Sequence, residues 1–157
     1  MKYPAVVRLL PLLALTALAS CASSSRIESG ITRVKIYRLD PQEVPSAAEP
    51  AIAFEQKHFL YGAVSDADRE ARRGSYYTVF FRTPDRTTPV HAKFEYRQAA
   101  TGFRVFTQEA TVQPRKGHVR FNVAGEDYRL RGRLLGWRVI LSQGGQVLGE
   151  RKSFLWE

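Results

Sequence analysis

The stretch Val90-His91-Ala92-Lys93-Phe94-Glu95-Tyr96-Arg97 decides the fold, because apolar and polar side chains alternate along it without interruption. Successive side chains of a β-strand point to opposite faces, so this period of two places one face in a core and the other in water. The same period recurs at residues 118–123, where Val119, Phe121 and Val123 alternate with polar residues. Both segments are predicted to be half-buried strands of an antiparallel sheet.

Much of the remaining chain carries strand signals as well. Residues 76–82 are dense in aromatic and β-branched side chains, and further strands are predicted within residues 31–39, 103–113, 134–141 and 146–156. The glycines of Gln143-Gly144-Gly145-Gln146 permit the positive φ that a hairpin turn needs. Residues 52–61 are a candidate second strand, although residues 51–57 would also tolerate a helical turn.

One short helix is expected at residues 65–73, where Ser65 can cap the start and Gly74 can end it. Seven to eight short strands with regular turns predict an all-β fold, a small antiparallel β-sandwich over residues 31–157. The strand count and the terminal hairpin resemble immunoglobulin and fibronectin type III domains, without a disulfide. In such a sandwich Trp137 and Trp156 are expected to anchor the core, with ligand stacking as the alternative.

Residues 1–20 have the composition of a secretory signal peptide. Lys2 and Arg8 precede a run of mostly leucine and alanine that extends from residue 9 to residue 18. As a helix this run would span about 15 Å, half of the roughly 30 Å hydrocarbon core of a bilayer. The run is therefore too short to cross a membrane, and a cleaved signal peptide is predicted.

The segment Leu18-Ala19-Ser20-Cys21 resembles the lipobox of bacterial lipoproteins. The resemblance implies that Cys21 becomes the first residue of the mature chain and carries acyl chains that hold the protein at a membrane. Ala22 stands where many inner-membrane lipoproteins have aspartate, which implies the outer membrane, on the side facing the periplasm. Residues 21–30 are small and polar and are expected to form a flexible tether. The alternative is ordinary secretory cleavage, with Cys21 merely close to the cut.

The charge of the chain is moderately positive. Cleavage after residue 20 removes Lys2 and Arg8 from the 24 basic residues and none of the 15 acidic ones, which leaves 22 against 15, a net charge of +7. This surplus is compatible with acidic polymers or lipid head groups as partners, and equally with an ordinary solvated surface. Nucleic acid is not an expected partner in the predicted compartment.

The sequence contains no recognised catalytic motif. Gly-x-Ser-x-Gly and phosphate-binding glycine loops are absent, and Cys21, the only cysteine, would be consumed by acylation. His58, His91 and His118 are isolated from one another, which favours surface or strand-end histidines over metal ligands. We therefore expect no enzymatic activity, no metal and no cofactor.

An acidic cluster at residues 66–70 resembles the start of a calcium loop. Its sixth position is Ala71 instead of glycine, and its twelfth is Tyr77 instead of glutamate. The favourable interaction of Asp66 and Asp68 with a helix start explains these carboxylates better.

Arg129, Arg131 and Arg133 form the one candidate binding feature of the mature domain. If the segment is extended, side chains two residues apart share a face at intervals of about 6.6 Å and form a row of guanidinium groups. Such a row could bind phosphates or carboxylates in a bidentate way. Near an outer membrane these anions are the phosphates of lipopolysaccharide and the carboxylates of peptidoglycan. The alternative is a solvated strand face.

The preferred hypothesis is a non-enzymatic lipoprotein whose β-sandwich acts as a structural, assembly or protein-interaction module in the cell envelope. The first alternative is a binding module for anionic envelope polymers that uses the three arginines. The second is an envelope hydrolase, which would require two carboxylates that converge in a cleft.

Overall fold

The computed structural model describes residues 29–43 and 50–156. The predicted signal peptide, Cys21 and residues 22–28 of the predicted tether lie outside the described residues. Residue 30, which ends the predicted tether, already belongs to the first strand. None of the described helices is long and apolar enough to span a bilayer.

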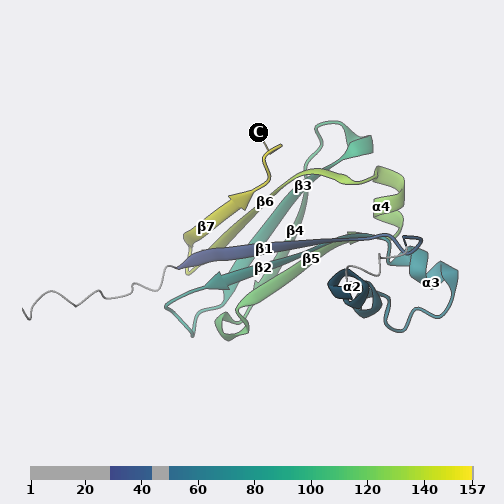
Figure 1. Ribbon diagram of the computed structural model, residues 1–157. Helices are drawn as coiled ribbons and strands as arrows, with labels where there is room; N and C mark the ends of the chain where they lie inside the picture. The colour runs from purple at the N-terminus through teal and green to yellow at the C-terminus, as the bar shows by residue number, and fades with distance from the viewer. Residues whose placement is uncertain (1–28, 44–49, 157) are drawn as a thin grey trace, which may run out of the picture.

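Within the described residues, seven strands form two antiparallel sheets that face each other (Figure 1). The strands are β1 (Gly30–Leu39), β2 (Gly74–Arg82), β3 (Val90–Gln98), β4 (Phe106–Val112), β5 (His118–Ala124), β6 (Leu134–Gln143) and β7 (Gln146–Lys152). The helices are α2 (Pro50–Leu60), α3 (Asp66–Ala71) and α4 (Glu126–Arg131), with short turns at η3 (Ala99–Thr101) and η4 (Pro114–Lys116). The prediction of a small all-β sandwich is confirmed.

One sheet has the order β1-β2-β5 and the other β4-β3-β6-β7. The fourth strand therefore joins the third, sixth and seventh, whereas in a constant immunoglobulin domain it joins the first, second and fifth. The strand order therefore differs from that of a constant immunoglobulin domain.

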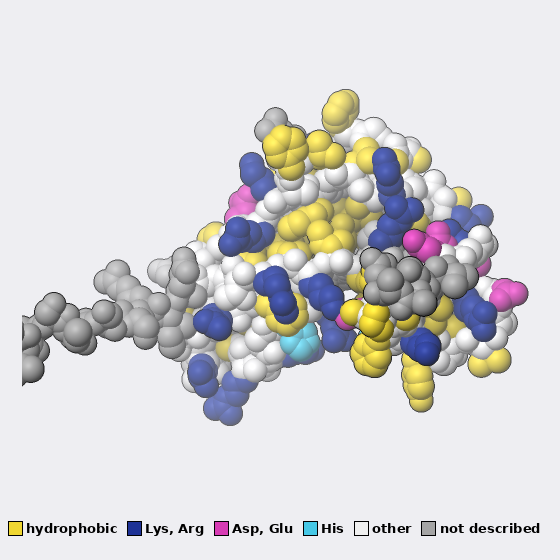
Figure 2. Space-filling model, viewed as in Figure 1, with side chains coloured by type: hydrophobic (Ala, Val, Ile, Leu, Met, Phe, Trp, Pro, Cys, Tyr) yellow, Lys and Arg dark blue, Asp and Glu magenta, His cyan; other side chains and the backbone are white. Residues whose placement is uncertain are grey.

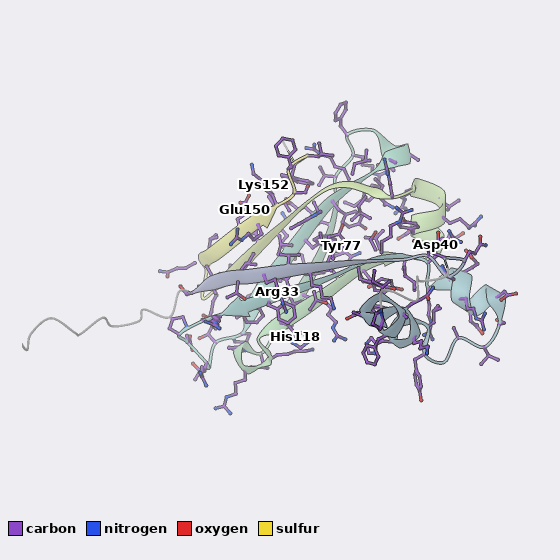
Figure 3. The ribbon with its side chains drawn as sticks, in the orientation of Figure 1. Arg33, Asp40, Tyr77, His118, Glu150 and Lys152 are labelled. Carbon is purple, nitrogen blue, oxygen red and sulfur yellow. The ribbon has the colours of Figure 1, made fainter. Side chains whose placement is uncertain are left out.

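The core lies between the two sheets, and the alternation at residues 90–97 and 118–123 correctly predicted its members. All seven apolar residues at the inward positions of these segments are buried. The ring of Phe94 in β3 lies 5.1 Å from that of Phe121 and 4.8 Å from that of Tyr77, measured between ring centroids. Phe121 and Tyr77 belong to the other sheet, so these contacts join the two layers. Figure 3 shows Tyr77 between the two sheets.

Two candidate extended segments are helical. Residues 50–60 form α2, because Pro50 suits a helix start and the following residues include good helix formers, Ala51, Ala53, Glu55, Gln56 and Lys57. Residues 126–131 form α4, because Gly125 and Gly132, with φ of 64° and 77°, turn the chain into and out of a short helix. The helix predicted at residues 65–73 is confirmed as α3, with a capping box between Ser65 and Asp68.

The sandwich has two ends of different character. At the end that we call the N-terminal end, β1 begins and the connections 83–89, 113–117 and 144–145 lie. At the opposite end, which we call the helical end, lie α2, α3 and α4, the connection 99–105 and residues 153–156 (Figure 1).

Candidate functional site

The candidate site lies on the outer face of the β1-β2-β5 sheet, where the connection between β1 and β2 folds back over the strands. This connection, residues 40–73, contains α2 and α3, and its described residues, 40–43 and 50–73, contribute none to the core. Arg33 in β1 and His118 in β5 lie on the side of the sheet that carries α2 (Figure 3). The outer face is therefore covered at the helical end and open toward the N-terminal end.

Phe59, in the last turn of α2, attaches the helix to the sheet. Its ring stacks on Tyr37 of β1 at 4.9 Å with 7° between the planes, and it lies 4.3 Å from Tyr76 of β2. Offset or tilted aromatic pairs at these distances are favourable beyond the area that they bury. This aromatic trio fixes the distance between α2 and the sheet.

Polar contacts fix the helix end as well. The Nη1 atom of Arg72, the residue after α3, donates to the carbonyl oxygens of Phe59 at 2.9 Å and Tyr61 at 2.5 Å. The last carbonyl groups of an α-helix have no partner within the helix, so this arginine completes the C-terminus of α2. The hydroxyl of Tyr76 in turn donates to the carbonyl oxygen of Arg72 at 2.6 Å.

Ion pairs join the connection to β1 and join its two ends to each other. The ammonium group of Lys35 in β1 pairs with the carboxylate of Glu55 in α2. Arg73, just before β2, donates to Asp40 at 2.9 Å and to Glu70 at 2.8 Å. The connection is thus held in place at its start, middle and end.

Between α2 and the sheet is a cavity of about 210 Å³, which we call the helix–sheet cleft. Ten residues line it: Lys35, Tyr37, Phe54, Glu55, His58, Phe59, Tyr76, Thr78, Phe80 and Arg120. Five of them are aromatic, if His58 is left aside, and they supply the walls. The charged groups of lysine, arginine and glutamate lie among them.

The cleft is chemically suited to an apolar group that carries a negative charge. Phe54 is 71% exposed and offers an uncovered aromatic face, and Arg33 lies with its guanidinium 4.4 Å from the ring centre of Phe80. Arg120 is exposed and makes no ion pair within the described part of the chain. An aromatic surface beside an unpaired cation attracts a carboxylate on an apolar body.

The two tyrosines of the cleft remain neutral hydrogen-bonding groups over the physiological pH range. Burial raises the pKa of Tyr37 above its usual value, and the carboxylates of Glu55 and Glu43 raise it further. Burial also raises the pKa of Tyr76, which Arg72 lowers to a smaller extent.

The volume of the cleft limits the size of a group that could occupy it. Sites for cofactors and drug-sized molecules occupy roughly 300–1,000 Å³, whereas this cleft has about 210 Å³. One or two side chains of a protein partner would fill it.

The structure does not form the expected row of arginines. Arg129 and Arg131 belong to α4, and Arg133 follows that helix, so the strand spacing that would align them is absent. Arg129 lies 3.8 Å from Glu126, and Arg131 lies 3.1 Å from Asp127. The geometric basis for an anion site at these three residues was therefore wrong.

The histidines lie at the surface or at a strand start, as predicted. His58 is exposed on α2, His91 is exposed on β3 with its Nδ1 atom 2.9 Å from the hydroxyl of Thr111, and His118 begins β5. Within residues 29–43 and 50–156, no three His, Cys, Asp or Glu side chains lie close enough together to hold a metal ion. Asp68, from the acidic cluster, accepts a hydrogen bond from the backbone N–H of Ser65, the N-cap residue of α3, at 3.0 Å.

Only one tryptophan contacts the core as expected. Trp137 in β6 lies 5.7 Å from the ring of Tyr77 and packs against the buried cluster. Trp156 is buried too, but it lies beyond β7, with the guanidinium of Arg97 4.7 Å and that of Arg138 5.4 Å from its ring. Since both arginines extend from the outer face of their sheet, Trp156 covers that face instead of filling the core.

Sequence reasoning missed the helix–sheet cleft, although one segment carried a signal for it. In Tyr76-Tyr77-Thr78-Val79-Phe80-Phe81, large apolar residues occupy both faces of the strand. A strand that is apolar on both faces is covered on both. The second cover is α2, which the sequence alone did not distinguish from a strand.

No protein-family model, no curated protein and no solved structure matches this chain.

Proposed function

We propose that this chain is a lipid-anchored protein of the bacterial cell envelope, attached through Cys21 to the outer membrane, with a non-enzymatic β-sandwich that binds a protein partner. The lipobox-like segment supports the anchor, and the helix–sheet cleft supports the binding role. The partner inserts an aromatic or aliphatic side chain between Phe54 and the sheet and places a carboxylate near Arg120.

The single observation that carries the binding role is the combination of aromatic walls, a small volume and an unpaired cation in the cleft. Binding energy in protein interfaces concentrates in a few anchor residues that fill desolvated pockets, and aromatic residues and arginine are enriched among them. The cleft offers one residue of each kind, the exposed ring of Phe54 and the guanidinium of Arg120.

The anchor is tested by replacing its acceptor. The substitution Cys21→Ala is expected to abolish incorporation of labelled palmitate and to release the protein from membranes. The nearby substitution Ser23→Ala serves as the control and should leave both unchanged. Label retained by the Cys21→Ala protein would contradict the anchor.

The binding role is tested by photocrosslinking in cells. A photoreactive phenylalanine derivative in place of Phe54 is expected to give a discrete protein adduct, and Arg120→Glu should weaken that adduct by charge repulsion. The matched control places the same derivative at Phe103, which is 91% exposed in the connection between β3 and β4. Equal adducts from the two positions, or none from position 54, would rule out the cleft as the binding site.

A further inference from the structure

The N-terminal end of the sandwich carries a dense group of basic side chains, which we call the basic rim. It consists of Arg82, Arg86, Arg115, Lys116 and Arg151, all exposed. The connections 83–89, 113–117 and 144–145 contain a single acidic residue, Asp85. On the face seen in Figure 2, the lower left of the molecule accordingly shows basic side chains without acidic ones among them.

The rim differs from the helical end in how its charges are neutralised. Within the described residues, none of the five rim side chains forms a salt bridge. At the helical end, in contrast, four arginines pair with carboxylates of their own or a neighbouring segment: Arg69, Arg73, Arg129 and Arg131. Arg38, Lys57, Arg104 and Arg133 at the helical end also form no salt bridge in the described part of the chain, but α2, α3 and α4 carry acidic residues beside them. The rim has only Asp85 and, next to Arg151 in β7, Glu150, so the larger excess of basic over acidic side chains lies at the N-terminal end.

The rim is built on connections with fixed geometry. The side-chain amide of Gln143, which is only 8% exposed, donates to the carbonyl oxygens of Asp85 at 3.1 Å and Thr88 at 2.6 Å. The carboxylate of Asp85 accepts from the backbone N–H groups of Thr87 at 2.7 Å and Thr88 at 3.1 Å. The backbone N–H of Phe81 donates to the carbonyl oxygen of Gly117 at 3.0 Å. The arginines thus extend from connections whose conformation is fixed by hydrogen bonds.

The rim also encloses space for a ligand group. Arg82, Arg86 and Arg115 line a cavity of about 560 Å³, which lies within the usual range for small-ligand sites. A second cavity, of about 210 Å³, connects Arg82 and Arg151 with the start of β1 at Gly30. Guanidinium groups bind phosphate oxygens in a bidentate way, so three of them around one cavity favour a phosphate group.

The position of this end relative to the anchor identifies the partner. The described chain starts at Ser29, at the N-terminal end, and eight residue steps separate Ser29 from Cys21. At full extension these steps span at most about 28 Å. If Cys21 is acylated, the rim is the part of the domain that can approach the bilayer surface to within the screening length of about 8–10 Å.

We propose that the basic rim docks the domain on the anionic phospholipid head groups of the membrane that holds Cys21, with head-group phosphate bound among Arg82, Arg86 and Arg115. The proposal rests on the anchoring that forms part of the proposed function. Docking orients the sandwich with its helical end away from the bilayer.

The experiment uses the acylated, full-length mature protein in vesicles of phosphatidylcholine with and without phosphatidylglycerol. Because Cys21 is the only cysteine and its thiol is acylated, Gln113→Cys introduces a single site for a fluorophore at the rim, and Phe103→Cys introduces one at the helical end. A quencher attached to lipid head groups is expected to quench the rim label in anionic vesicles at low salt only, and the other label in neither.

Charge substitutions then test the residues. Each basic residue near an anionic surface raises the ratio of docked to undocked protein roughly fivefold. The triple variant Arg82→Gln/Arg86→Gln/Arg115→Gln should therefore lower this ratio roughly 100-fold. The matched control changes three arginines at the other end, Arg129→Gln/Arg131→Gln/Arg133→Gln, and should keep the quenching. Thermal melting verifies that both variants fold, and Arg115→Gln/Lys116→Gln is a second rim variant with an intermediate expected loss.

Several results would overturn the proposal. Equal losses in both triple variants would mean that net charge, and no particular surface, attracts the domain. Equal quenching in neutral vesicles would exclude anionic lipid as the partner. Loss of quenching on addition of inorganic phosphate, at matched ionic strength, would assign the rim to a soluble phosphate. Retention on phosphatidylcholine vesicles reports the anchor separately, so its failure is distinct from failure of docking.

Discussion

Replacing Phe59 by alanine should destabilise the fold even though Phe59 lies outside the core between the sheets. The side chain is half-buried, and full burial of a phenylalanine is worth about 1.5–3 kcal/mol, so its burial contributes about 1 kcal/mol. Its ring contacts with Tyr37 and Tyr76 add about 0.5–1.5 kcal/mol each. The expected loss in free energy of unfolding for Phe59→Ala is about 2–4 kcal/mol.

Phe54→Ala provides the matched comparison, since it makes the same chemical change five residues earlier in α2. Phe54 is 71% exposed, so its removal should change the free energy of unfolding by less than about 0.5 kcal/mol. The measurement is chemical denaturation of both variants, with hydrogen exchange of the α2 amides to localise the effect. In the crosslinking experiment, by contrast, position 54 is expected to contact the partner directly.

The size and location of the loss decide whether the reasoning is right. If α2 opens as a separate unit, Phe59→Ala should accelerate exchange throughout α2 while the amides of β3 and β6 keep their protection. A variant whose unfolding free energy and α2 exchange both equal those of the wild type would refute the role of Phe59 as the attachment point.

Two further changes are predicted to alter stability. Lys93 and Arg138 hold the pKa of Glu95 below its usual value. The stability that this carboxylate provides is therefore present at neutral pH and is lost as the pH falls through the folded-state pKa. Between about pH 7 and pH 3, the free energy of unfolding should fall less in Glu95→Gln than in the wild type, as measured by chemical denaturation at each pH. Gly125→Ala should lower the free energy of unfolding by about 2–4 kcal/mol, because φ is positive and the new Cβ would lie 2.8 Å from a backbone oxygen. Gly144→Ala, with a similar φ but open space around the new Cβ, should lower it by only about 1–2 kcal/mol, and thermal melting of both variants measures the difference.

The strands of the sandwich could be predicted because their signal is local. At residues 90–97 and 118–123 the period of two follows from burial on one face only, and any fold that buries that face preserves the alternation. The hairpin at residues 143–146 was predictable for a similar reason, since the paired glycines supply the turn conformation within the segment itself.

The two unpredicted helices depend on contacts between distant residues. In α2 the aromatic residues suit a strand as well as a helix, and what favours the helix is the aromatic outer face of β1 and β2 together with Arg72 at its C-terminus. At α4, Arg129, Arg131 and Arg133 matched an extended pattern, but Gly125 and Gly132, both with positive φ, border a short helix that contains only the first two of them. Alternating charge in a six-residue segment does not distinguish the two conformations.

The proposed binding role of the helix–sheet cleft depends on where the cleft lies relative to the basic rim. Ordering the described residues of this connection, 40–43 and 50–73, costs about 1 kcal/mol per residue in backbone entropy, and they add no side chain to the core. The connection does place α2, with the exposed Phe54, over the sheet at the helical end, where α2 forms the second side of the cleft. The cleft and the rim cavity share no residue, so a bilayer in contact with the rim leaves the cleft accessible to a partner. Docking at one end would therefore present the binding surface at a defined height and orientation, which a tether alone does not provide.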